Sequence, residues 1–315
     1  MTLTRGHFLT TGTVALIALC YAIAAPSSPL ESNGEGHESG LNRNPGGSIP
    51  LTPDCRRVAD RLEQGLPEGW GIVIHEPFVL AGDCDEADLE RHYRQTIAPT
   101  VRALSIQYFD HSPEWPITIV VCSSDDSYRE CNRCLEKRER NEYSGVYSRR
   151  DHRVVVNVAT GEGTLAHELT HALAHADFAE MPEWLDEGLA SLHEECEFSP
   201  DGFQLIGLEN WRGAILRNAF QGGRLRSISS LACEQFASSD RATIDYAQAR
   251  YFCLFLERHH ILEAFYRKCR QRCQTDPAGI ETLGELFETK DLRTVDKQFQ
   301  EWVKLLKPNA YHSGE

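Results

Sequence analysis

Residues 163–190, GTLAHELTHALAHADFAEMPEWLDEGLA, predict two successive helices. Small and apolar residues recur at helical spacing from Thr164 to His175, which predicts one helix. Pro182 then opens a second helix, because proline is well accommodated in the first turn of a helix. The first helix carries the pattern H-E-x-x-H over residues 167–171.

This pattern predicts a metal site through the geometry of a helix. Residues four apart lie on one face, so His167 and His171 can converge on a single ion. Glu168, one step round the helix, is placed to act as a general base without being a ligand. One Zn2+ per chain is therefore the cofactor that we expect. The alternative is that the two histidines lie on the surface of an amphipathic helix.

Patterns outside this stretch predict an α+β fold. Helical spacing occurs over residues 54–64, 85–109 and 125–140, with a new helix or a kink expected at Pro99. Extended segments are expected at 70–80, broken at Pro77, and at 116–122 and 153–158. After Gly163 the pattern is helical almost throughout, with further helices near 209–220, 245–272, 277–288 and 294–306.

The segment PEWLDEGLA at 182–190 resembles the W-L-x-E-G-x-A signature of the gluzincin zinc metallopeptidases in the peptidase MA-like superfamily. The resemblance covers residues 150–305 and includes small bacterial relatives of the aminopeptidase-N-like branch. It implies a thermolysin-like domain with a mixed α/β N-terminal half around a small sheet and a mostly helical C-terminal half. It also implies that His167, His171 and Glu187 are the zinc ligands, that Glu168 is the catalytic base, and that the substrate is a peptide or protein.

Two other residues compete with Glu187 for the third ligand position. Asp177 lies where metzincins place their third ligand, but those enzymes need glycine at the position of Ala174 and a methionine turn downstream. The only methionines are Met1 and Met181, which leaves Glu187 favoured. His175 shares the helix face of the two histidines, but one straight helix cannot surround an ion, so we expect His175 to be solvated or to cap the helix.

Further residues are candidates for supporting roles. Asp186 and Glu183 are candidate hydrogen-bond partners of the metal-binding imidazoles. Some gluzincins carry an acidic residue four positions after the ligand glutamate, where this chain has Ser191.

Residues 245–252, DYAQARYF, resemble the Y-A-Q-x segment of small gluzincin-like relatives. Tyr246 is accordingly the candidate that stabilises the oxyanion, and His259 and His260 are weaker alternatives. Tyr246 and Tyr251 are otherwise expected to be core residues of a long helix.

The N-terminus predicts export. Arg5 precedes an apolar run from Val14 to Ala25, which ends in an A-x-A cleavage site. A run of about twelve apolar residues is shorter than the roughly 20 needed to span a bilayer, although an uncleaved segment would act as an anchor. The expected organisation is a signal peptide at 1–25, a disordered linker at 26–52, an α/β part at 53–145, a catalytic part at 146–307 and a tail at 308–315. The destination is the periplasm, the cell envelope or the extracellular space.

Composition restricts the partners. The chain has 32 basic and 47 acidic residues, a formal net charge of −15. Such a charge argues against binding to nucleic acid or to anionic membranes, and no stable membrane insertion is expected after signal cleavage. Ten of the 11 cysteines follow the signal, and an even number in an exported protein predicts disulfide bonds.

These observations together predict a secreted zinc metallopeptidase. No G-x-M-E-N segment of the kind that holds a free N-terminus in aminopeptidases is present, so aminopeptidase specificity is not implied. The alternatives are an inactive or metal-binding relative that serves as a recognition module, and a zinc amidohydrolase that acts on a non-peptide amide.

Overall fold

A computed structural model describes residues 51–136, 144–238 and 240–306. The predicted signal peptide, all but the last two residues of the predicted linker and the whole predicted tail at 308–315 lie outside these ranges. The first half contains helices and a sheet: α1 (Thr52–Gly65), β1 (Gly71–His75), β2 (Phe78–Gly82), α2 (Glu86–His92), the π-helical turn η1 (Tyr93–Ile97), α3 (Ala98–Gln107), β3 (Ile117–Cys122), α4 (Asp125–Glu136), β4 (Gly145–Ser148), β5 (Arg153–Asn157) and the 3-10 turn η2 (Val158–Thr160). The second half is mainly helical: α5 (Gly163–Asp177), α6 (Glu183–Glu194), β6 (Cys196–Phe198), β7 (Leu205–Gly207), α7 (Arg212–Gln221), α8 (Ile228–Cys233), α9 (Ala242–Arg258), α10 (Leu262–Gln271), α11 (Ile280–Leu286) and α12 (Arg293–Leu305). The molecule is therefore of mixed α+β class, as predicted.

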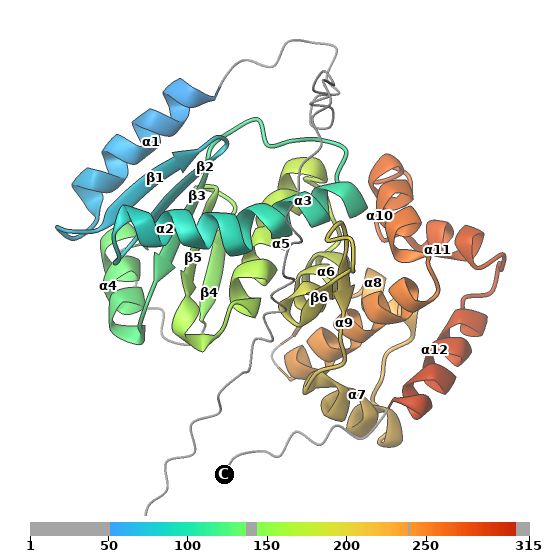
Figure 1. The fold of residues 1–315 in the computed structure, drawn as a ribbon. Coiled ribbons are helices and arrows are strands. Elements are labelled where there is room, and N and C mark those ends of the chain that lie inside the picture. The colour runs from blue at the N-terminus through green and yellow to red at the C-terminus, as the bar shows by residue number, and fades with distance from the viewer. Residues whose placement is uncertain (1–50, 137–143, 239, 307–315) are drawn as a thin grey trace, which may run out of the picture. The chain divides into compact units, whose positions relative to one another are not determined.

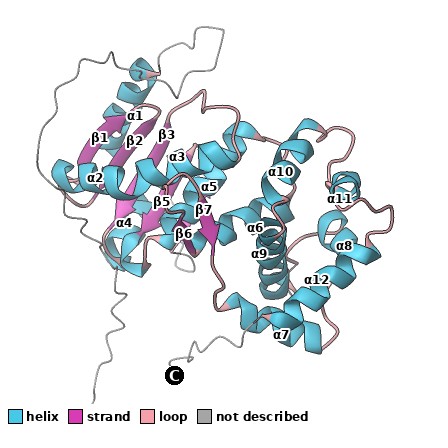
Figure 2. Cartoon of the chain, turned by 45° about the vertical axis from the view of Figure 1, so that its right-hand side comes forward, coloured by secondary structure: helices cyan, strands magenta, loops and turns pink. Residues whose placement is uncertain are grey.

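The main sheet has the strand order β1-β2-β3-β5-β4 (Figure 2). Strands β2, β3 and β5 are parallel, and β1 and β4 pair antiparallel with their neighbours at the two edges. The parallel strands are continuous apolar runs, such as ITIVVC in β3, which is typical of strands buried on both faces. Among the described residues β4 has β5 as its one neighbour in the sheet, so β4 is an edge strand of the described sheet.

The two faces of the sheet belong to separate hydrophobic clusters. Along each central strand the side chains alternate, so that Val120 faces α1 and α4 whereas its neighbours Ile119 and Val121 face α2, α3 and α5. Figure 1 shows α1 and α4 on one side of the strands and α2 and α3 on the other. The second cluster continues from α5 into the C-terminal helices and forms the principal core.

The helix α6 is held between α5 and α9, which are its two main packing partners. Gly188 makes the close approach to α9 feasible, because a Cβ at this position would lie 2.8 Å from the Cys253 sulfur and 2.9 Å from the Ala249 carbonyl oxygen. The buried guanidinium of Arg250 on α9 donates to the carbonyl oxygens of Ser191 and Leu208. These contacts fix α6 against the core.

Most predicted elements are present, and the differences have physical causes. The new helix predicted at Pro99 is confirmed, because Pro99 lies in the first turn of α3, whereas the π-helical turn η1 between α2 and α3 was not predicted. The predicted helix at 245–272 is two helices, because the chain turns at His260, whose φ is 58°. Short elements without a strong periodic pattern were not predicted, namely β4, β6, β7 and α8.

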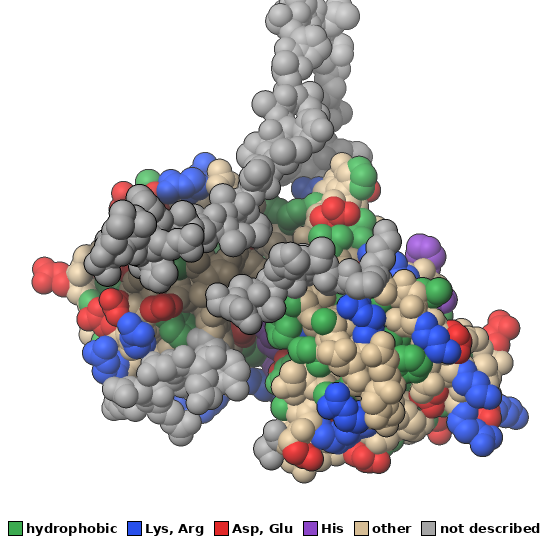
Figure 3. Space-filling view, turned by 90° about the horizontal axis from the view of Figure 1, so that it is seen from below, with side chains coloured by type: hydrophobic (Ala, Val, Ile, Leu, Met, Phe, Trp, Pro, Cys, Tyr) green, Lys and Arg blue, Asp and Glu red, His purple; other side chains and the backbone are tan. Residues whose placement is uncertain are grey.

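The structure also bears on membrane-spanning helices, surface charge and the state of the cysteines. Within the described ranges no helix is long and apolar enough to cross a membrane, and the apolar run at 14–25 lies outside them. Acidic and basic side chains are interspersed over the face shown in Figure 3. All ten cysteines after the signal are free thiols in this structure, so the disulfide bonds stay a prediction.

Candidate metal centre

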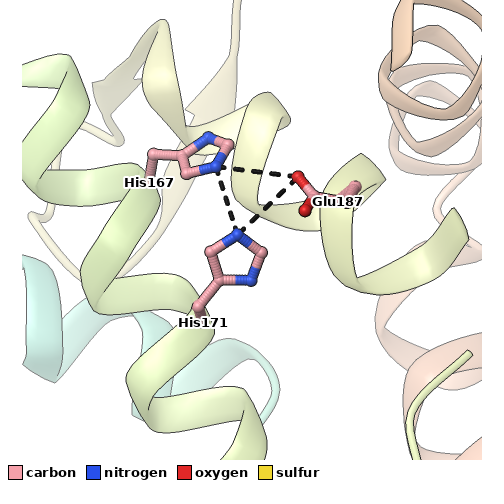
Figure 4. Close-up of side chains that lie close together, drawn as sticks. All are labelled: His167, His171 and Glu187. Carbon is pink, nitrogen blue, oxygen red and sulfur yellow. Dashed lines mark hydrogen bonds and ion pairs between the residues drawn. The ribbon is translucent and has the colours of Figure 1, made fainter. Parts of the chain in front are cut away.

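His167 and His171 on α5 and Glu187 on α6 point toward a common centre (Figure 4). The two Nε2 atoms are 3.1 Å apart, and Oε2 of Glu187 lies 3.8 Å from His167 Nε2 and 3.7 Å from His171 Nε2. Glu187 lies 16 positions beyond His171 in the sequence, and the turn between α5 and α6 brings the two residues together. The three residues that the sequence singled out as ligands are therefore neighbours.

The donor set and its spacing suit zinc. Ligand atoms about 2.0–2.1 Å from a tetrahedral ion lie roughly 3.3 Å from one another. The separations of 3.1–3.8 Å bracket that value. Two imidazoles and one carboxylate are also the ligand set of several catalytic zinc sites that keep a fourth position open.

Glu168 lies beside this trio and is almost fully buried. Burial raises the pKa of Glu168 to about 7, and the nearby His171 opposes this rise only in part. The carboxylate accepts a hydrogen bond from the backbone N–H of Tyr147 on β4. A backbone donor of the edge strand thus holds the side chain that the sequence predicts to be the base.

The two histidines differ in their electrostatic environment. Burial lowers the pKa of His167 far below its usual value, and the neighbouring His171 lowers it further. Burial acts in the same direction on His171, but the adjacent Asp186 and Glu187 carboxylates outweigh it and raise the pKa of His171 to about 9. Burial likewise raises the pKa of Glu187. A metal ion at this position would have to displace a proton from His171.

Asp186 contacts two imidazoles. Its Oδ1 lies 2.6 Å from His171 Nδ1 and its Oδ2 lies 2.7 Å from His175 Nε2. The candidate role of Asp186 as a partner of a metal-binding histidine therefore agrees with its position, whereas Glu183 is exposed on the first turn of α6. The expectation for His175 was wrong: its side chain is only 13% exposed and is bonded to Asp186, so it is neither solvated nor a cap.

A pocket of about 530 Å³ opens over the trio. One wall is β4 with Gly145, Val146 and Tyr147, and the opposite wall contains Trp211, Arg212 and Tyr246. Tyr246 lines this pocket and its hydroxyl donates to the Glu187 carboxylate. The structure therefore places the oxyanion candidate at the site.

The remaining candidates lie elsewhere. Tyr251 is a core residue, and its hydroxyl bonds the backbone of Asn210. The Asp177 carboxylate is bonded to Tyr266 and Arg270, away from the trio. His259 and His260 are exposed at the break between α9 and α10.

Two further features at this site were not predicted from the sequence. Glu194 Oε2 lies 3.7 Å from His167 Nδ1 and is 2.8 Å from Arg212 NH1. Its spacing of seven residues from Glu187, two turns of the same helix, is the signal that could have indicated it. Tyr147 gave no such signal, because β4 is a short strand without a distinctive pattern.

No protein-family model matches the chain, and no curated protein matches it in sequence.

Proposed function

We propose that this protein is an exported zinc-dependent metallopeptidase with a gluzincin-type site on a thermolysin-like catalytic domain. The observation that carries this proposal is the convergence of His167, His171 and Glu187 from two helices, with Glu168 beside them. A resident ion would have three protein ligands and one open position, as catalytic zinc requires. Zinc bound there would act as a Lewis acid on the scissile carbonyl and lower the pKa of a water molecule.

In the proposed mechanism Glu168 transfers the proton, and Tyr246 stabilises the negative charge that develops on the carbonyl oxygen. Glu168 accepts a proton from the attacking water as the water oxygen bonds to the carbonyl carbon. As the C–N bond breaks, Glu168 passes that proton to the leaving amine, so that a carboxylic acid and an amine result. The pKa of Glu168, raised by burial to about 7, suits a group that must both accept and donate a proton near neutral pH.

Tyr246 is the proposed donor to the oxyanion. Its hydroxyl is on the pocket wall and already donates to a negatively charged oxygen, that of Glu187. A preorganised donor facing the position where negative charge develops lowers the barrier more than one that must be recruited from solvent.

The edge strand favours a peptide substrate over another amide. Gly145 to Tyr147 form one wall of the pocket, and β4 pairs with β5 on its other side only. An extended peptide can add to such an edge through backbone hydrogen bonds, and a non-peptide amide lacks this regular pattern of donors and acceptors.

The proposal is tested on purified residues 26–315 by elemental mass spectrometry and by a peptide-cleavage screen. Wild-type protein should contain one zinc ion per chain and cleave peptides. Glu187→Ala should lose most of the zinc, and Glu168→Gln should keep it while cleavage falls by about 10²–10⁴-fold. Glu183→Gln is the matched control, because Glu183 is an exposed acidic residue of the same helix.

Other outcomes would favour the alternatives. Zinc without hydrolysis of any amide would indicate a recognition module, and hydrolysis of non-peptide amides alone would indicate an amidohydrolase. Full activity of Glu168→Gln would contradict the mechanism, and absence of metal from folded, zinc-supplied protein would contradict the zinc site itself.

A further inference from the structure

A chain of three side chains connects α5 and α6 behind the proposed ligands. Asp186 lies between His171 and His175, with one carboxylate oxygen bonded to each imidazole. Asp186 is 15% exposed and His175 is 13% exposed, so water competes little for these bonds. Asp186 directly precedes Glu187, and one helix therefore supplies both a ligand and the group that holds another ligand.

The geometry of this chain is that of hydrogen bonds. Its two N–O separations are 2.6 and 2.7 Å, the lengths of charge-assisted hydrogen bonds. The atoms of the proposed zinc ligands are instead 3.1–3.8 Å apart, which leaves room for an ion between them. The same three side chains could also be read as a second metal cluster, but a ligand pair on one ion would be separated by roughly 3.3 Å.

The environment of His175 fixes its orientation. Its ring lies 5.5 Å from the ring of Tyr147 on β4 and 6.0 Å from the ring of His171 one turn earlier on α5. His175, itself a residue of α5, thus packs between Tyr147 of the edge strand and the ligand candidate His171, with Nε2 directed at Asp186. Without His175, the Asp186 carboxylate would be held by His171 alone and could rotate about its χ2 angle.

His167 lacks an equivalent arrangement. Its Nδ1 is buried and makes no hydrogen bond in the described part of the chain, and the nearest carboxylate oxygen, from Glu194, is 3.7 Å away. The contrast indicates that the site is preorganised on the His171 side.

We propose that His175 is a positioning residue that holds Asp186 and thereby orients His171 toward the metal. This inference rests on the proposed zinc site. Partners of this kind fix the tautomer and orientation of a ligand imidazole, and their loss weakens metal affinity by about 10–100-fold.

The test compares His175→Leu, which removes the donor, with His175→Gln, which restores an N–H at a similar reach. Zinc affinity is measured by competition with a chelator, and circular dichroism confirms the fold. We expect His175→Leu to weaken zinc binding about 10–100-fold and His175→Gln to remain within a few-fold of wild type. His75→Leu is the control, because His75 makes a comparable 2.8 Å bond to the Glu90 carboxylate far from the metal centre.

A second measurement separates failure of this inference from failure of the zinc site. Histidine-selective ¹H–¹⁵N spectra of metal-free protein should show protected protons on His171 Nδ1 and His175 Nε2, and Asp186→Ala should abolish both. Unchanged zinc affinity in His175→Leu, or two zinc ions in wild type with one lost in His175→Leu, would overturn the positioning role. If wild type binds no zinc, the proposed function fails, while absence of the two imidazole protons would still overturn the hydrogen-bond chain.

Discussion

Gly145 on β4 lies where a side chain would press on the proposed general base. A Cβ built at this position would be 2.5 Å from Thr164 Cγ2 and 3.0 Å from both Cγ and Oε1 of Glu168. Because carbon atoms make favourable contact at about 3.5–4.0 Å, Gly145→Ala must move Thr164 by roughly 1 Å and Glu168 by roughly 0.5 Å.

These displacements set the expected magnitudes. A misplacement of about 1 Å at a reacting group costs about 10²-fold in rate, so kcat should fall about 10–100-fold. Overpacking of a buried contact costs about 1–3 kcal/mol of unfolding free energy. Zinc affinity should change little, because Glu168 is not one of the proposed ligands.

The assay combines peptide cleavage, zinc content and thermal unfolding in matched variants. Gly65→Ala is the control for the glycine replacement itself, because a Cβ there meets only Leu135 Cδ2, at 3.8 Å. In Gly145→Ala/Thr164→Ser the shorter side chain removes the closest overlap, so stability should recover while kcat stays low. A wild-type kcat in Gly145→Ala would refute the placement of Glu168 against β4. A loss of zinc equal to the loss of rate would refute the assignment of Glu168 as a base that is not a ligand.

Two other predictions concern residues outside the proposed ligand set. Burial lowers the pKa of His193 to about 3. Between about pH 6.5 and 3 the unfolded chain therefore binds a proton that the folded chain does not, and stability falls as the pH falls, by up to about 1.4 kcal/mol per pH unit. Urea unfolding at several pH values should show that the free energy of unfolding falls less steeply toward acid pH in His193→Gln than in wild type. Identical slopes in the two proteins would exclude His193 as the source of this pH dependence. The buried thiols of Cys122 and Cys131 hydrogen-bond to each other, so we expect a disulfide between them in protein from an oxidising compartment, where the proposed export would place it. Peptide mass spectrometry without reduction should detect that link, and alkylation of both thiols after denaturation would contradict it.

The histidine pair of the candidate site could be identified from the sequence because its arrangement depends on local geometry. The spacing of His167 and His171 fixes one face of a helix, whatever surrounds it. Long periodic or continuously apolar segments, such as 116–122 and the helix at 164–175, were predicted for the same reason, and their strands and helices are present. Short elements such as β4 have too few residues to show a period, and they were missed.

What the tertiary structure decided is how distant residues meet. The turn between α5 and α6 brings Glu187 to the two histidines, and the edge strand provides a backbone donor to Glu168. The sequence alone suggested that His175 was solvated or capped the helix, because one straight helix cannot place three ligands around an ion. Its partner Asp186 comes from the next helix, so only the packing of α6 against α5 determined its environment.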